Sequence, residues 1–315
     1  MSLERALGFA VLVDERIPQR VVLFYYPDNC GTSPQGMRPV RVERVPVLEW
    51  RSDMIVDRLL KQLLSDASIS TRQTVLVVCG GTFERELFMG LGFANVTISN
   101  LDNQYRATLA PFEWSHQDAE KLSYPDNSFD IVFVHAGLHH CHSPHRGLLE
   151  MYRVARHAVI VTEARDSLAM RIAKRFGFTE EYEIEAVSSE NFMSGGVRNG
   201  PIPNFIYRWT ENEVLKTVKS FEPRYVPRAR FFYGLHLPYQ RFRSTQRQVI
   251  RLFLIILGPI VELLAKLVPK QGNQFAFVLF KAGQLQPWLC QDSDGEIVVS
   301  KETVEGMGRV YKRVG

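Results

Sequence analysis

The chain has 315 residues, of which 45% are hydrophobic and 23% are charged. This composition is typical of a globular protein and excludes a disordered or low-complexity chain. The formal net charge of +4 is too small for this length to indicate a nucleic-acid partner, and none is expected. The four cysteines form no C-x-x-C pair, which argues against a disulfide framework and favours reduced thiols in the cytoplasm.

Residues 1–50 form a distinct N-terminal region. Apolar runs at 9–13 and 21–26 alternate with polar, turn-rich stretches such as 27–36, which predicts a small β appendage. The first apolar run stops at Asp14, Glu15 and Arg16, so it predicts neither a signal peptide nor a membrane anchor.

Residues 51–165 carry the pattern of an α/β core. Leucines at helical spacing after residue 54 predict a helix that leads into the first strand. Strands are expected at 74–79, 95–101, 113–117, 129–135 and 157–163, with helices between them. This alternation predicts right-handed crossovers and a buried parallel sheet.

In residues 166–282 the regular alternation of strands and helices ends, and we expect this region to complete the sheet. The stretch 164–178 predicts a helix that ends at Gly177, and Thr210 with Glu213 forms a capping box for another helix. Further strands are expected within 222–234 and at 273–281. Two insertions, 186–206 and 234–272, exceed what the sheet needs, and 283–315 are expected to form a peripheral tail.

One block of the core is more specific than the fold pattern around it. Before the fourth strand the sequence reads Asp118-Ala119-Glu120-Lys121-Leu122 and then Tyr124-Pro125-Asp126-Asn127-Ser128-Phe129-Asp130. This block resembles the D-A-x-x-L-P and F-D-x-V pattern of class I S-adenosylmethionine-dependent methyltransferases of the type 11 branch. The resemblance implies a doubly wound, seven-stranded, mostly parallel sheet, S-adenosylmethionine as the cofactor, and methyl transfer to a nucleophile.

The resemblance also implies the residues that hold the cofactor. The turn Cys79-Gly80-Gly81 corresponds to the glycine-rich loop under the methionine portion. At the end of the second strand Asn100 or Asp102 would accept the ribose hydroxyls, and an ionised acceptor favours Asp102. Asp118 would accept from the adenine amino group, and the backbone N–H of Ala119 would meet the ring.

Three departures from the family pattern keep alternatives open. Cys79 and Phe83 stand at usual glycine positions, and Val77 stands where an acidic residue is common. These departures motivate the alternative hypothesis of a catalytically inactive protein that still binds S-adenosylmethionine. A nicotinamide-dependent oxidoreductase is disfavoured, because no G-x-G-x-x-G follows the first strand.

Five histidines lie close together after the fourth strand and could suggest a metal centre; they are His135, His139, His140, His142 and His145. Cysteine partners at zinc-site spacing are missing, and the pair His139-His140 resembles a frequent family feature, so we expect no metal. Because imidazole titrates near neutral pH, His135 or His139 is the candidate general base.

The segment 249–268 is strongly apolar. Its charge-free run has only 10 residues and contains Gly258-Pro259, whereas a membrane-spanning helix needs about 20. One hypothesis is a helix pair packed on the core or on another subunit of a homo-oligomer. The other is an interfacial membrane segment, because Arg251, Lys266 and Lys270 flank the run. With the two insertions on the acceptor side, a small-molecule, glycan or lipid-linked acceptor is expected.

Overall fold

The computed structural model describes residues 9–13, 21–25, 55–237, 248–281 and 283–306. The chain divides into two compact units, residues 1–52 and 53–315. In the first unit β1 (Phe9–Val13) pairs antiparallel with β2 (Val21–Tyr25), within the two apolar runs of the expected β appendage. The rest of that appendage, residues 238–247 of the second insertion and residues 307–315 of the tail lie outside the described residues.

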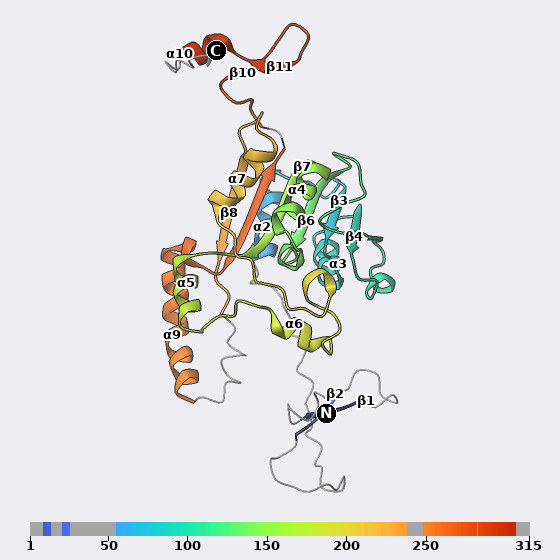
Figure 1. Cartoon of the computed structure of the whole chain (residues 1–315), viewed down its shortest axis with the longest axis vertical. Coiled ribbons are helices and arrows are strands. Elements are labelled where there is room, and N and C mark those ends of the chain that lie inside the picture. Colours follow the sequence, from blue (N-terminus) through green and yellow to red (C-terminus); the bar gives the residue numbers. More distant parts are fainter. Residues whose placement is uncertain (1–8, 14–20, 26–54, 238–247, 282, 307–315) are drawn as a thin grey trace, which may run out of the picture. The chain divides into compact units, whose positions relative to one another are not determined.

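The second unit is built on a seven-stranded sheet (Figure 1). Its strands are β3 (Val75–Val78), β4 (Val96–Asn100), β5 (Glu113–His116), β6 (Phe129–His135), β7 (Ala155–Ala164), β8 (Arg228–Gly234) and β9 (Gln274–Phe280). The order is β5-β4-β3-β6-β7-β9-β8, and only β9 runs antiparallel to its neighbours β7 and β8. The predicted doubly wound, mostly parallel sheet is confirmed.

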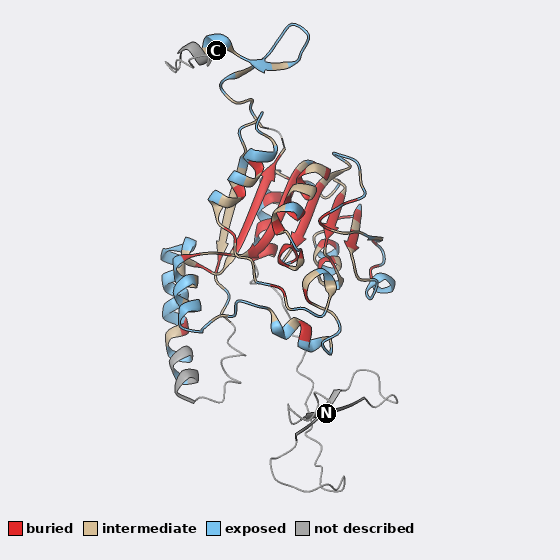
Figure 2. Ribbon diagram, viewed as in Figure 1, coloured by how far each residue is buried: buried red, intermediate tan, exposed pale blue. Residues whose placement is uncertain are grey.

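Helices cover both faces of this sheet. Alternate residues of β3 and β6 point to opposite faces, as the pleat requires. On one face they pack with α2 (Ile55–Ser65) and α3 (Thr82–Gly90), and on the other with α4 (Pro144–Val154) and α7 (Glu211–Phe221). Figure 2 shows the buried residues concentrated on the strands between these helices.

The strand order reverses between β3 and β6. β4 and β5 lie on one side of this point and β7 on the other, so the loops that leave β3 and β6 diverge. Ligands of open α/β sheets bind in the crevice at the carboxyl ends of the strands at such a switch point. The fold therefore places a candidate site beside the turns after β3, β4, β5 and β6.

Helix signals after β7 are also confirmed. α5 (Leu168–Arg175) starts at its N-cap Ser167, and Gly177 takes a φ of +72° just past its end. The capping box of α7 is present, with Glu213 N–H donating to Thr210 and the Glu213 carboxylate accepting from Thr210 N–H. Between α5 and α7 the chain forms only α6 (Ile184–Ser189) and the short turn η4 (Val197–Asn199).

The expectation of a helix pair in 249–268 is wrong. The structure has one helix, α9 (Gln248–Leu267), with Pro259 inside it. A proline removes one backbone donor, and the Leu, Ala, Glu and Lys residues that follow favour continuing the helix. No helix among the described residues has both the length and the apolar character to cross a bilayer.

The remaining elements are short. The turns η2 (Arg106–Thr108), η3 (Leu138–His140) and η5 (Pro269–Gln271) follow β4, β6 and α9. In the tail, β10 (Leu289–Gln291) pairs antiparallel with β11 (Ile297–Val299), and α10 (Lys301–Gly306) follows.

Candidate functional site

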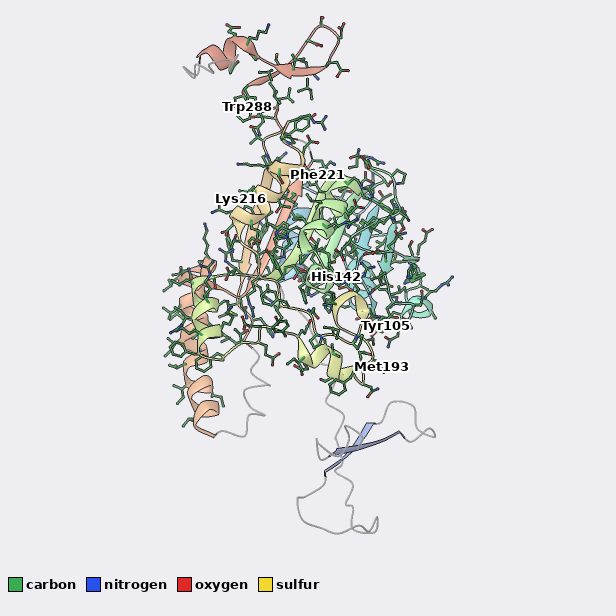
Figure 3. All side chains as sticks on the ribbon, viewed as in Figure 1. Tyr105, His142, Met193, Lys216, Phe221 and Trp288 are labelled. Carbon is green, nitrogen blue, oxygen red and sulfur yellow. The ribbon has the colours of Figure 1, made fainter. Side chains whose placement is uncertain are left out.

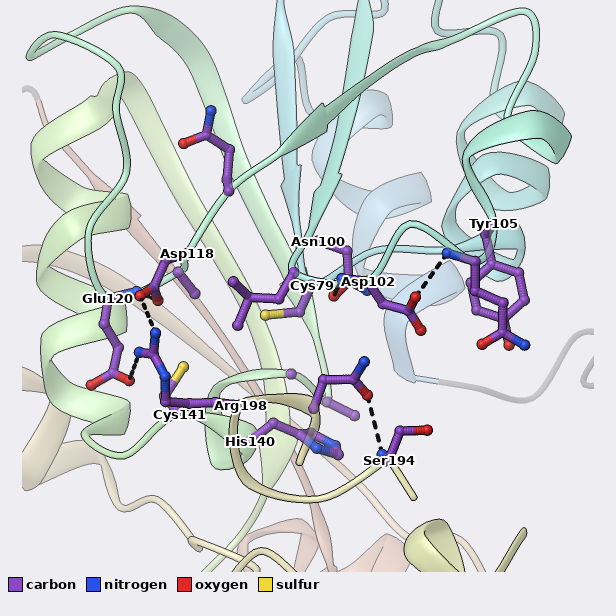
Figure 4. A pocket seen from close by; sticks show the side chains of 18 of the residues that line it. Cys79, Asn100, Asp102, Tyr105, Asp118, Glu120, His140, Cys141, Ser194 and Arg198 are labelled. Atoms are coloured by element: carbon purple, nitrogen blue, oxygen red, sulfur yellow. Dashed lines mark hydrogen bonds and ion pairs between the residues drawn. The ribbon is translucent and has the colours of Figure 1, made fainter. Parts of the chain in front are cut away.

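A cavity of about 240 Å³ lies at the carboxyl ends of the parallel strands (Figure 4). It is enclosed by the turns that leave β3, β4, β5 and β6 and by the segment between α6 and η4. Its lining residues include Cys79, Asn100, Asp102, Tyr105, Gln117, Asp118, Ala119, Glu120, Gly137, His140, Cys141, Glu190, Ser194, Arg198 and Asn199. Five of the predicted cofactor residues therefore share one cavity: Cys79, Asn100, Asp102, Asp118 and Ala119.

The turn after β3 is tightly packed. Cys79 takes a φ of +54°, and a Cβ on Gly80 would lie 2.5 Å from Val77 Cγ1 and 2.9 Å from Ile98 Cγ2. Gly81 N–H donates to the buried carboxylate of Glu84 at 2.7 Å, and burial raises the pKa of that carboxyl. Glycine at position 80 thus lets the turn sit directly on the sheet, while Cys79 supplies the side chain that lines the cavity.

The end of β4 presents an amide and a carboxylate. Asn100 Nδ2 donates to Gly80 O at 3.1 Å, so this side chain ties β4 to the turn after β3. Asp102 accepts from Gln104 N–H at 2.8 Å and also lines the cavity. Asn100 therefore holds the turn, and the Asp102 carboxylate is the acceptor that faces the cavity from this strand.

The end of β5 presents Asp118 and the buried Ala119. Asp118 Oδ1 accepts from Glu120 N–H at 2.9 Å, and its Oδ2 lies 2.8 Å from Arg198 Nη2. Burial raises the pKa of Asp118, but these hydrogen bonds and the Arg198 charge outweigh burial and hold the pKa below its usual value. Asp118 is thus an ionised acceptor at the cavity wall.

Arg198 is a cavity residue that the sequence analysis did not single out. It lies in η4 with a φ of +51°, and its guanidinium pairs with Asp118 and, at 3.3 Å, with Glu120 (Figure 4). A Cβ on the neighbouring Gly196 would lie 1.9 Å from Ile202 O, so the loop is tightly folded. The sequence signal was an arginine inside the glycine-rich run 195–200. Figure 3 labels two residues on the segments that lead here, Tyr105 after β4 and Met193 before η4.

The two predicted base candidates do not line the cavity. Nδ1 of His135 bonds with Thr162 Oγ1, and its ring lies 5.0 Å from that of Phe83. Burial lowers the pKa of His135 to about 4. Both ring nitrogens of His139 face carboxylates, with Nδ1 2.8 Å from Glu163 and Nε2 3.2 Å from Glu183.

His139 therefore carries a buried positive charge. Burial lowers its pKa, but Glu163 and Glu183 outweigh burial and raise the pKa to about 10. Its neighbour His140 does line the cavity, at a ring distance of 4.6 Å from His139. Burial and the charge of His139 lower the pKa of His140, so this imidazole is neutral at neutral pH.

The described residues contain one group whose atoms lie close enough to hold a metal: His139, His140 and Glu183, within 4.8 Å of one another. A protonated His139 between Glu163 and Glu183 accounts for this closeness by charge pairing alone. Asn204 Nδ2 also donates to Glu183, at 3.0 Å. The expectation that the site holds no metal stays a prediction.

Residues 77–161, which span β3 to β7, match the family model described as "Methyltransferase domain". The strand order with its antiparallel β9 agrees with that match. The chain contains a class I methyltransferase domain.

Solved structures similar to the methyltransferase domain come from several organisms. A magnesium protoporphyrin IX methyltransferase from Synechocystis, solved with bound SAH, is 14% identical, with 72% of this chain and 82% of that chain covered and a TM-score of 0.42. A SAM-dependent methyltransferase from Methanosarcina mazei is 12% identical, with 70% and 98% covered and a TM-score of 0.44. One from Thermotoga maritima is 13% identical, with 72% and 92% covered and a TM-score of 0.41. A comparison with curated proteins found no match.

S-adenosylmethionine is the cofactor of this class of domain, and the cavity residues fit it. Gly137 lines the cavity and leaves no room for a side chain, since a Cβ there would lie 2.6 Å from Cys79 Cβ, so backbone forms this part of the cavity wall. Acceptors suited to hydroxyl and amino donors, Asp102 and Asp118, come from neighbouring strands. Phe83, at a usual glycine position, packs on the core beneath the sheet and does not line the cavity.

Proposed function

We propose that the protein transfers a methyl group from S-adenosylmethionine to a hydroxyl or another nucleophile of a small-molecule, sugar or lipid-linked acceptor. The observation that carries this proposal is the meeting of two carboxylates and a neutral imidazole, those of Asp102, Asp118 and His140, around one cavity. The carboxylates suit the donors of a nucleoside, and the imidazole suits the proton of an acceptor.

In this proposal each part of the cavity wall has a role toward the cofactor. Asp102 accepts the ribose hydroxyls, Asp118 accepts from the adenine amino group, and Ala119 N–H meets the adenine ring. The turn Cys79-Gly80-Gly81 lies under the methionine portion. Asn100 acts indirectly, because its side chain holds the Gly80 carbonyl and thereby the turn.

When bound, S-adenosylmethionine supplies a methyl group already activated by its sulfonium. The protein then has to orient the acceptor, exclude water and remove the acceptor's proton. We assign proton removal to His140 in place of His135 and His139, since it lines the cavity and its lowered pKa leaves it neutral. His139 is a positioning residue, because Glu163 bonds both its ring and the N–H of Leu138, which fixes η3.

We assign the segment 190–199 a role toward both the cofactor and the acceptor. Glu190, Ser194 and Arg198 from this segment line the same cavity as the residues of the sheet. The insertion 186–206 was expected to serve the acceptor alone; the ion pair of Arg198 with Asp118 also couples this segment to the carboxylate that we assign to the adenine amino group. None of the described residues of α9 lines the cavity.

A methyl-transfer assay separates this proposal from an inactive protein that only binds S-adenosylmethionine. Protein and methyl-labelled S-adenosylmethionine are incubated with three acceptor pools: water-soluble metabolites, free glycans and lipid-linked saccharides. We expect label in one pool with the wild type and strongly reduced label with His140→Gln, although both bind the cofactor equally. Cofactor binding without label in any pool would favour the inactive protein.

A further inference from the structure

α9 exposes apolar side chains on most of its circumference. Leu252, Ile256, Leu263 and Leu267 are 61%, 58%, 60% and 71% exposed. Among the α9 residues whose burial the structure describes, only Gly258 is buried, and Leu257 and Ala265 are half-buried. These three residues occupy a narrow part of the helix circumference, and Figure 2 shows the described residues of α9 mostly exposed.

α5 carries a second exposed apolar stripe. Leu168, Ile172 and Phe176 follow one another at helical spacing and are 63%, 50% and 68% exposed. The first turn of α5 is fixed to the end of the α9 region, because Ser167 Oγ and Ala169 N–H both donate to Gln271 at 3.1 Å. We call the exposed apolar residues of α5 and α9 the α5–α9 surface.

Basic residues lie at the ends of the two helices of the α5–α9 surface. α5 ends in Arg175 and in Lys174, whose Nζ lies 2.7 Å from a Glu181 oxygen, and Lys266 lies in the last turn of α9. Glu262 is the acidic residue within α9. Apolar helices edged with lysine and arginine are typical of segments that lie in the headgroup region of anionic membranes.

Three environments could cover this surface: the protein core, a second copy of the chain, or lipid. Packing on the core is inconsistent with the exposure of the described α9 residues. A second copy would cover the apolar side chains but would give no role to Arg175 and Lys266, whereas anionic headgroups would pair with them. A bilayer crossing is excluded for the described helices, which leaves a helix lying in the membrane interface.

Exposed apolar residues continue from α5 toward the cavity. Tyr182, Ile184, Phe192 and Met193 lie on the chain between α5 and Ser194, and they are 52%, 58%, 64% and 77% exposed. Ser194 and Arg198 then line the cavity. A continuous segment thus links the α5–α9 surface to the cavity wall (Figure 1).

We propose that the α5–α9 surface docks the protein on an anionic membrane and that the methyl acceptor is amphiphilic, with its apolar part held in that membrane. The proposed docking depends only on the exposed apolar side chains and the basic residues of α5 and α9. The acceptor class rests on the proposed methyl transfer.

The docking test uses the full-length protein and two kinds of vesicle, phosphatidylcholine alone and phosphatidylcholine mixed with phosphatidylglycerol. We expect sedimentation with the anionic vesicles and little with the neutral ones. Ile256→Glu and Leu263→Glu should each lower the anionic-vesicle partition coefficient about tenfold or more, because an exposed apolar side chain that the membrane would bury is replaced by a charge. Val299→Glu in β11 is the matched control, since this apolar residue is 58% exposed outside the α5–α9 surface, and it should sediment like the wild type.

Two outcomes would overturn the docking. A wild type that ignores anionic vesicles and is a monomer in light scattering contradicts it directly. A wild-type dimer that ignores vesicles and dissociates on Leu263→Glu would show that a second copy covers the surface. Arg175→Glu combined with Lys266→Glu should reduce the preference for anionic over neutral vesicles; an unchanged preference would contradict the role of charge.

S-adenosylmethionine affinity, measured on the same samples, keeps the two proposals distinguishable. We expect the α5–α9 variants to bind the cofactor as the wild type does, which also shows that they are folded. Vesicle binding without cofactor binding would support the proposed membrane docking and contradict the proposed methyl transfer. The acceptor class fails if labelled methyl groups enter a water-soluble acceptor at the same rate with and without vesicles.

Discussion

Arg198 and Asp118 form an ion pair across the cavity, with Arg198 Nη2 2.8 Å from Asp118 Oδ2. Asp118 belongs to the sheet end that we propose for the adenine ring, and Arg198 belongs to the glycine-rich segment after α6. The guanidinium of Arg198 is thus paired with the carboxylate to which the cofactor's amino group would donate. Cofactor binding and the position of the 190–199 segment should therefore be coupled.

Replacing Arg198 by Gln should tighten S-adenosylmethionine binding by up to about fivefold. The pair is partly exposed, and pairs of this kind contribute about 0.2–1 kcal/mol, which the cofactor no longer has to displace. Titration calorimetry measures the change. Arg224→Gln is the control, because Arg224 pairs with Glu222 outside the cavity. Weaker binding by Arg198→Gln would instead make Arg198 a direct cofactor contact.

His140→Gln should lower kcat about 10²- to 10⁴-fold if His140 removes the acceptor proton. Because the pKa of His140 is lowered, the wild-type rate should fall only in acid, below the usual histidine pKa of about 6.5, where the ring becomes protonated. The variant should lack this acidic limb in its pH–rate profile. The exposed His142, labelled in Figure 3, gives the control His142→Gln. An acidic limb that survives in His140→Gln would assign it to another group.

The buried charge of His139 predicts a pH-dependent stability. Its pKa is about 10 in the folded protein and about 6.5 when unfolded, so the stabilisation is complete below about pH 6.5 and is lost as the pH rises through 10. His139→Gln leaves Glu163 buried without its charged partner, which should cost about 3–5 kcal/mol near neutral pH.

Denaturant unfolding of wild type and His139→Gln should therefore give a large difference at about pH 6 and a smaller one at about pH 10. The exposed His116 gives the control His116→Gln, whose difference from the wild type should not change between these pH values. An equal cost of His139→Gln at both pH values would mean that His139 is neutral in the folded protein.

Gly80→Ala should destabilise the fold by about 1–3 kcal/mol, because its Cβ would lie 2.5 Å from Val77 Cγ1 in a packed core. Gly90→Ala is a matched control at the end of α3, where a Cβ meets nothing within 4 Å, and it should be neutral or slightly stabilising. Thermal unfolding of both variants tests this. Equal melting temperatures would show that the turn after β3 can move away from the sheet.

The sheet could be predicted from the sequence because its strands are buried on both faces. Leu76 and Val78 pack on one side of β3 while Val75 and Val77 pack on the other, so the strand reads as an unbroken apolar run. Asp118 was also identifiable, since it stands in a distinctive block at the end of β5.

Other features depend on contacts between distant segments. The sequence around Arg198 does not indicate that this residue contacts Asp118, because the two residues are far apart in the chain and only the folded loop brings them together. Likewise, the adjacent histidines differ in charge: His139 is protonated between two carboxylates, whereas burial and the charge of His139 keep His140 neutral although its Nε2 lies 3.5 Å from Glu183. Burial and partners decide these pKa values, and neither can be read from residue order.

The most direct test of the account is titration calorimetry of S-adenosylmethionine with the wild type, Asp118→Ala and Asp126→Ala. The wild type should bind at millimolar affinity or better, and Asp118→Ala should weaken binding by about 1–3 kcal/mol, the cost of leaving a polar group unpaired. Asp126, whose side chain is 70% exposed beside Arg153, is the control and should leave binding unchanged. No binding by the wild type, or equal binding by Asp118→Ala, would contradict the proposed cofactor site.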